Sequence, residues 1–129
     1  FLGLDASPND LAPDELGCAD TVSAILQKAL GKDMGIKYTI STAQMYRELS
    51  TSKDYIRVQD HQAGDILISP TGYGNGNLSN GHVAIWGEGD KIMSNSSATG
   101  TFLENFNEQN WKARYVANGG FPMFTFRKL

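Results

Sequence analysis

The single cysteine of this sequence, Cys18, lies where a helix is expected to begin. A helix N-terminus presents unpaired N–H groups and the positive end of the helix dipole, and both favour a thiolate over a thiol. A thiolate is the nucleophile that acyl transfer requires, and N–H groups of the same turn can bind the oxyanion of the tetrahedral intermediate. The alternative is that Cys18 is a small buried hydrophobe, the first apolar residue on the buried side of that helix.

Two histidines are available as partners for such a thiolate. His82 opens the apolar run HVAIW, whose alternation indicates a strand that can project its first side chain into a cleft. His61 lies in the polar segment DHQAG, where we expect it to be exposed to solvent. A lone strand histidine is more often structural than catalytic. A Cys–His pair formed by a helix start and a strand is what nucleophilic catalysis needs, however, so we expect His82 to be the base.

A hairpin turn is expected between Trp86 and Lys91, where the sequence is GEGD. If these two flanking residues pair, His82 faces Asn95 on the next strand, and facing side chains lie on the same side of an antiparallel sheet. Asn95 would then accept the imidazole N–H and fix the tautomer that leaves the other ring nitrogen for the thiol. A one-residue bulge would put Ser94 in that position instead.

Hydrophobic periodicity predicts the elements that must hold these residues. Apolar residues recur at helical spacing from Gly17 to Leu30, after which Gly31 is expected to end the helix. A second helix is predicted from Thr42 to about Ser50, with Ser41 as its N-cap. Short runs rich in β-branched and aromatic residues predict strands at Tyr55–Gln59, Asp65–Ser69, His82–Trp86, Lys91–Ser94, Arg114–Ala117 and Met123–Arg127. Helices first and strands afterwards predict an α+β fold with an antiparallel sheet.

The segment Pro70–Gly81, PTGYGNGNLSNG, is too rich in glycine and asparagine for a regular strand or helix. It is expected to form an irregular loop directly before His82. One interpretation is a long surface hairpin loop, and the other is the rim of a substrate cleft that moves on binding. Tyr73 of this loop and Trp86 of the following strand are expected to line the substrate groove, although Trp86 is equally expected in the core.

Composition restricts the class of protein. A chain of 129 residues with 40% hydrophobic and 19% charged residues fits one globular domain, 1–129. The net charge of -3 argues against a nucleic-acid partner, since phosphate binding needs a positive surface. No apolar run approaches the roughly 18 residues that span a bilayer, and one cysteine cannot form an internal disulfide. The chain starts with Phe1 and shows no leader, which is typical of a processed protein or an excised domain.

Asp60, His61 and Asp65 form the one group that could be interpreted as a metal cluster. The group offers a single histidine, and Asp65 is better explained as the turn residue that opens a strand. We therefore expect neither a metal nor another cofactor.

Three segments occur in an order that resembles a known enzyme family. They are GCADTVSAIL (Gly17–Leu26), AGDILI (Ala63–Ile68) and GHVAIWGEGDKIMSNSS (Gly81–Ser97). A cysteine at a helix start, a Gly-Asp strand start and a His-Val-Ala-Ile strand resemble the NlpC-type and CHAP (cysteine, histidine-dependent amidohydrolase/peptidase) cell-wall hydrolases. The resemblance implies a papain-like fold, cleavage of peptide or amide bonds in peptidoglycan, and no metal. It implies Cys18 as nucleophile, His82 as base and Asn95 as the residue that orients the histidine.

The expected function is therefore hydrolysis of amide bonds in the stem peptide of peptidoglycan, by an enzyme that is secreted, periplasmic or phage-associated. An endopeptidase and an amidase would use the same residues, and a wall-remodelling enzyme, a phage lysin and a toxin all fit. An inhibitor or immunity protein is a compatible further partner. The alternatives are a papain-like cysteine hydrolase of another amide, in a protein or a lipid, and a non-catalytic binding domain in which Cys18 is structural.

Overall fold

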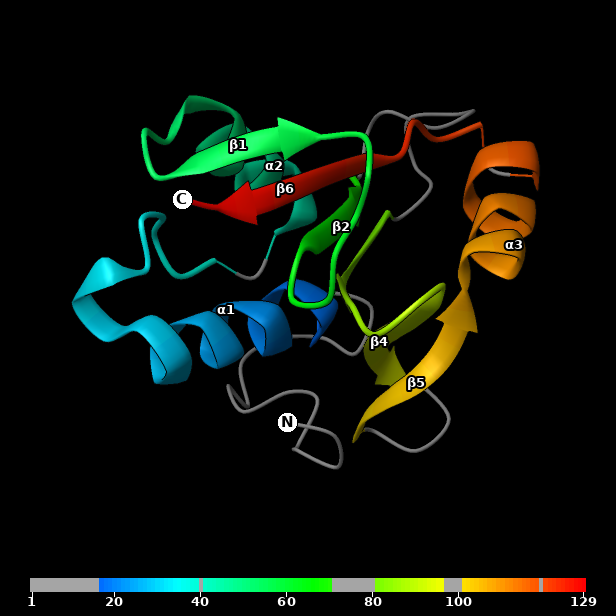
Figure 1. The fold of residues 1–129 in the computed structure, drawn as a ribbon, viewed down its shortest axis with the longest axis horizontal. Coiled ribbons are helices and arrows are strands. Elements are labelled where there is room, and N and C mark those ends of the chain that lie inside the picture. The colour runs from blue at the N-terminus through cyan, green and yellow to red at the C-terminus, as the bar shows by residue number, and fades with distance from the viewer. Residues whose placement is uncertain (1–16, 40, 71–80, 97–100, 119) are drawn as a thin grey trace.

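The computed structural model describes residues 17–39, 41–70, 81–96, 101–118 and 120–129 (Figure 1). Its helical elements are α1 (Gly17–Leu30), the 3-10 turn η2 (Gly31–Asp33), α2 (Thr42–Thr51), α3 (Glu108–Trp111) and the π-helix η3 (Lys112–Asn118). Its strands are β1 (Tyr55–Val58), β2 (Ile66–Ser69), β3 (His82–Trp86), β4 (Lys91–Ser96), β5 (Thr101–Asn107) and β6 (Phe124–Lys128). They form an antiparallel six-stranded sheet in the order β1-β6-β2-β3-β4-β5, which confirms the predicted α+β class. Among the helices described, none combines the length and apolar character required to cross a bilayer.

The ends of the first two helices follow from signals in the sequence. Gly31 follows α1 with a φ of 52°, a left-handed conformation that favours glycine. Ser41 caps α2, where its hydroxyl accepts a hydrogen bond from the N–H of Gln44 at 3.2 Å. Both predicted signals are confirmed. Because α1 begins at Gly17, the backbone of Cys18 lies in its first turn, as expected.

The two faces of the sheet are covered by different clusters of buried side chains. Alternation along β3 directs Val83 and Ile85 to one face and His82, Ala84 and Trp86 to the other. The first, which we call the helical face, packs on residues of α1 and α2: Val22, Ile25, Leu26, Met45 and Leu49. The second, which we call the aromatic face, is covered by Trp111, Tyr115 and Phe121. In Figure 1, α1 and α3 accordingly lie on either side of β4.

The β3–β4 hairpin has a different register from the one predicted. Trp86 pairs with Ile92 rather than with Lys91. The N–H of Gly87 donates to the carbonyl of Lys91 at 2.8 Å, so the turn is one residue longer than expected. Gly89, in the middle of this turn, has a φ of 64°, and a left-handed residue at this position permits the longer loop. The predicted pairing of Trp86 with Lys91 is therefore wrong by one residue.

The strand predicted at Arg114–Ala117 is wrong, because this segment is helical. α3 begins after Asn107. The side-chain oxygens of Asn107 and Asn110 each accept a hydrogen bond from the backbone N–H of the other residue, which forms a capping box. The helix then widens into η3. Trp111 and Tyr115 are four residues apart and both pack on the aromatic face, so tertiary packing overrides the local preference for a strand. Strand β5, which leads into this helix, has no counterpart among the predicted strands.

Candidate active site

His82, the candidate base, lies at the first position of β3, opposite Ser69 of β2. Its Nε2 atom is 2.9 Å from Oγ of Ser94 on β4, which is hydrogen-bonding distance. Ser94 is fully buried. A hydroxyl that holds Nε2 fixes the orientation of the ring, and it leaves Nδ1 as the nitrogen that a thiol would have to approach.

Aromatic rings surround the imidazole of His82. The rings of Trp111 and Tyr115 stack near it with centroid distances of 5.4 and 5.5 Å, and Phe106 meets it edge-on at 6.0 Å. Burial among these rings, and secondarily the positive charge of Arg114, lower the pKa of His82 from 6.5 to about 4. At neutral pH the imidazole is therefore uncharged and can accept a proton.

Ser94, the alternative to Asn95 as the residue facing His82, is the side chain that the structure brings to the imidazole. The hairpin register explains this contact, because the turn that is one residue longer places Ser94 on the sheet face that carries His82. Asn95 also lies in β4, where it pairs with Phe102 of β5. The Asn95 side chain is outside the described part of the chain, so its catalytic role stays a prediction.

α1, which carries Cys18, and the imidazole of His82 lie on opposite faces of the sheet. α1 packs against the helical face, which carries Val83 and Ile85, whereas the imidazole of His82 lies on the aromatic face. The side chain of Cys18 is not among those described, and its contact with His82 stays a prediction. Because His82 is the first residue of β3, a thiol carried by α1 would have to approach it around this end of the strand.

Asp20, in the first turn of α1, has a structural role that sequence reasoning did not assign. Its carboxylate is fully buried and accepts a hydrogen bond from the hydroxyl of Tyr38. Burial and the hydrogen bond to Asp20 raise the pKa of Tyr38 above its usual range, so the phenol stays protonated and keeps donating. The hydroxyl of Ser23 adds a second tie, because it donates to the carbonyl of Thr39 at 2.8 Å. These bonds fix the start of α1, which carries the backbone of Cys18, to the segment before α2.

Trp86, one of the two predicted groove residues, is a core residue. It is 1% exposed, and its indole N–H donates to Oγ1 of Thr125 at 3.1 Å. His61 is half-buried: its ring stacks on Trp86 with centroids 3.5 Å apart, and its Nε2 donates to the carbonyl of Gly89 at 2.7 Å. Tyr73, the other predicted groove residue, lies outside the described residues. Substrate contacts by Tyr73 and Trp86 stay predictions.

Asp65, considered above as a metal ligand, pairs with an arginine. Its carboxylate accepts hydrogen bonds from Nη2 of Arg127 at 2.9 Å and from Nε of the same residue at 3.1 Å. This pair fastens β6 to the start of β2. Within the ranges that the structure describes, no three His, Cys, Asp or Glu side chains are grouped so that they could hold a metal ion.

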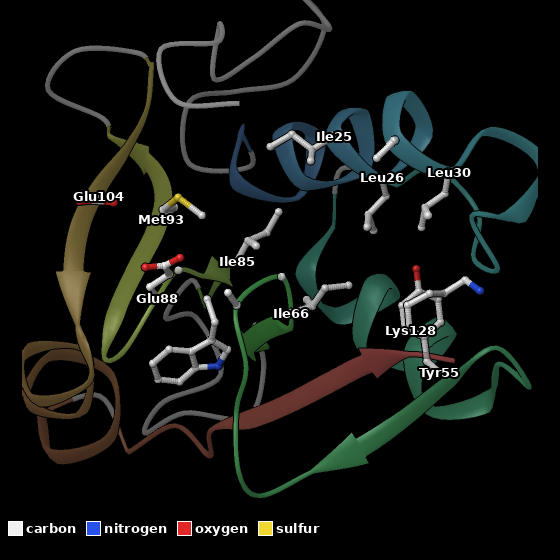
Figure 2. A pocket seen from close by; sticks show the side chains of 15 residues that line it. Ile25, Leu26, Leu30, Tyr55, Ile66, Ile85, Glu88, Met93, Glu104 and Lys128 are labelled. Atoms are coloured by element: carbon white, nitrogen blue, oxygen red, sulfur yellow. The ribbon is translucent and has the colours of Figure 1, made fainter.

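A separate apolar pocket of about 510 Å³ lies between α1 and the sheet (Figure 2). Its apolar walls include Ile25, Leu26, Leu30, Ile66, Ile85 and Met93. Three charged side chains also belong to its lining: Glu88, Glu104 and Lys128. Neither His82 nor Ser94 is among the described residues that line it, so the pocket and the candidate base are distinct features.

Comparison with known proteins adds no family assignment. No protein-family model matches this sequence, and no curated protein matches it. The resemblance to NlpC-type and CHAP hydrolases therefore stays a prediction that depends on the three sequence segments.

Proposed function

We propose that this protein is a papain-like cysteine hydrolase that cleaves amide bonds in the peptide of bacterial peptidoglycan, with Cys18 as nucleophile and His82 as base. One observation carries the proposal: Nε2 of His82 is hydrogen-bonded to Ser94 at 2.9 Å, which orients the ring and leaves Nδ1 for the thiol. At neutral pH the imidazole of His82 is uncharged, which is the protonation state that a general base needs. The position of Cys18 in the first turn of α1 favours its thiolate. The choice of peptidoglycan comes from the family resemblance.

The proposed reaction is acyl transfer in two steps. Nδ1 of His82 accepts the thiol proton while the sulfur of Cys18 attacks the amide carbon, and the imidazolium then protonates the leaving amine as the C–N bond breaks. In the second step His82 takes a proton from water, and the resulting hydroxide attacks the thioester. The C–S bond breaks, the acid is released and the proton returns to the sulfur. The hydroxyl of Ser94 accepts a hydrogen bond from the Nε2–H group and stabilises the imidazolium, with Asn95 as the other candidate for this role.

A second candidate function is a non-catalytic binding domain in which Cys18 is a core residue. It is favoured by the position of the imidazole of His82 on the aromatic face, away from the face on which α1 packs. In that case the stacking of His82 with Trp111 and Tyr115 is purely structural. The two candidates differ in one requirement, because the hydrolase needs the sulfur and Nδ1 to meet at the end of β3.

The test is digestion of purified peptidoglycan, followed by mass spectrometry of the soluble fragments. The proposal expects new amino and carboxyl termini with the wild-type protein and with His61→Gln, a control at the other histidine, and none with Cys18→Ala. If the wall stays intact while a protein or lipid amide is cut, the hydrolase stands and the substrate is wrong. If no amide is cut and Cys18 reacts like an ordinary thiol, the binding domain is the better interpretation.

A further inference from the structure

Arg114 is an exposed cation in the immediate surroundings of His82. It lies on η3 next to the buried Tyr115, and its guanidinium carbon is 5.5 Å from the centroid of that ring. The ring of Tyr115 in turn lies nearly parallel to the imidazole of His82, with 5.5 Å between centroids and 16° between planes. One aromatic ring therefore connects Arg114 to the candidate catalytic base.

No carboxylate among the described residues forms an ion pair with Arg114. The ion pairs among the described residues join Lys112 to Glu108 at 3.7 Å and Arg127 to Asp65 at 2.9 Å. The charge of Arg114 acts instead on the nearby imidazole. A guanidinium group presents several N–H donors in a planar fork that matches a carboxylate, and an exposed one can receive that carboxylate from solvent.

We propose that Arg114 binds a free carboxylate of the substrate, so that the hydrolase selects acidic peptides. The inference rests on the proposed function, because it places the substrate beside His82. It also restricts the position of the carboxylate. Arg114 and His82 each lie 5.5 Å from the centre of the Tyr115 ring. Since consecutive Cα atoms are about 3.8 Å apart, the carboxylate should lie within about two residues of the bond that is cut.

Carboxylate binding would also assist the chemistry at His82. The charge of Arg114 opposes protonation of the imidazole, and a bound carboxylate would neutralise that charge. The pKa of His82 is then expected to rise when an acidic substrate binds, so the base accepts the thiol proton more readily in the complex. The chain carries a net charge of -3, and attraction of an anion must therefore come from such a local site.

The first experiment compares soluble peptidoglycan fragments with the same fragments after their free carboxylates have been converted to carboxamides. The wild-type protein is expected to cut the untreated fragments with a kcat/KM about 10- to 100-fold higher, the range for a charge-assisted hydrogen bond. Arg114→Gln should remove this preference, mainly through KM, and Arg114→Lys should restore part of it. Arg57→Gln is the matched control, since Arg57 is also an exposed arginine over an aromatic ring but lies on β1, at the far edge of the sheet from β5.

The second experiment separates this inference from the proposed function. NMR of the His82 ring measures its pKa with and without the acidic dipeptide acetyl-alanyl-glutamate, and with its uncharged amide. The acidic form should raise the pKa in the wild type and not in Arg114→Gln, and the amide should have no effect. If the shift appears but no amide bond is ever cut, the carboxylate site stands and the hydrolase fails. If the shift or the kinetic preference persists in Arg114→Gln, or the shift is absent from the wild type, the inference is wrong.

Discussion

The two faces of the sheet differ in the side chains that their strands present. On the helical face, most buried strand residues are apolar: Ile66, Ile68, Val83, Ile85 and Phe126. Tyr55 is the exception, and its hydroxyl donates to the carbonyl of Met34 at 2.7 Å. On the aromatic face, polar groups lie among rings and are hydrogen-bonded. Ser69 accepts from the indole of Trp111 at 3.2 Å, and Thr125 accepts from the indole of Trp86 at 3.1 Å. His82 completes this set through its bond with the buried hydroxyl of Ser94.

This difference suits the two faces to different roles under the proposed function. Burial of apolar surface stabilises a fold at about 25 cal/mol per Å², and it needs no directional partner. Buried polar groups cost free energy unless each is paired, so a face that gathers several of them is under a geometric constraint that packing alone does not impose. We interpret the helical face as the support of the domain and the aromatic face as the site of its chemistry.

The largest expected effect comes from removing the candidate base on the aromatic face. His82→Ala should lower the rate of peptidoglycan hydrolysis by about 100- to 10,000-fold, the range for loss of general acid–base catalysis. His61→Gln should leave that rate within a few fold. Fragment release measured by chromatography gives the rates, and thermal unfolding of both variants verifies that they are folded. Full activity in a folded His82→Ala protein would end the claim that this face carries the chemistry.

Truncation of one large core residue on each face tests whether the two faces contribute differently to stability and to activity. Trp111→Ala and Leu49→Ala should each lower the free energy of unfolding by several kcal/mol, about 3–5 for the first and 2–5 for the second, because both side chains are buried. Urea denaturation measures these losses. Only Trp111→Ala should also reduce activity per folded molecule, since Trp111 stacks on His82. Equal activity losses in the two variants would contradict the division of roles.

Neighbouring residues of β4 give a smaller and more local test. Ser94→Ala should reduce kcat/KM by about tenfold and stability by about 0.5–1.5 kcal/mol, because Nε2 of His82 loses its partner. Ser94→Thr keeps a hydroxyl and should recover most of the activity. Asn95→Ala should cost less than Ser94→Ala in the same assay. A larger loss of kcat/KM in Asn95→Ala than in Ser94→Ala would indicate that Asn95 orients His82.

A further effect concerns the pH dependence of stability. The pKa of His82 is about 4 in the folded protein, below the ordinary value of 6.5. Between these two pH values the unfolded chain binds this proton more readily, so the free energy of unfolding should fall as the pH decreases from 6.5 to about 4. Above 6.5 this group should contribute no pH dependence. Urea midpoints of the wild type and His82→Gln, compared across this range, isolate the contribution, and parallel curves would speak against it.

Local signals in the sequence were sufficient for much of the fold. The glycine at position 31 and the serine at position 41 mark a helix end and a helix start through backbone and capping chemistry that needs no tertiary context. Alternation in HVAIW correctly separated Val83 and Ile85 from His82. Alternation states which residues share a face, but it does not state which face a helix covers. The position of the imidazole away from α1 was therefore beyond sequence reasoning.

The remaining differences also have tertiary causes. The hairpin register depends on Gly89 adopting a left-handed conformation, and a glycine permits this without requiring it. The helix at Arg114 depends on Trp111 and Tyr115 reaching the same buried cluster, which no local preference specifies. Ser94 was left open as an alternative to Asn95 because the sequence did not fix the register to within one residue. The longer turn places Ser94 on the face of His82.

The most direct test of the central claim is the reactivity of the sulfur of Cys18. Its alkylation rate with iodoacetamide is measured at neutral pH in the folded wild type and in His82→Ala. An activated nucleophile beside Nδ1 of His82 should react faster than a free thiol and should lose that advantage when the imidazole is removed. A rate no higher than that of a free thiol, unchanged in His82→Ala, would contradict the proposed catalytic pair.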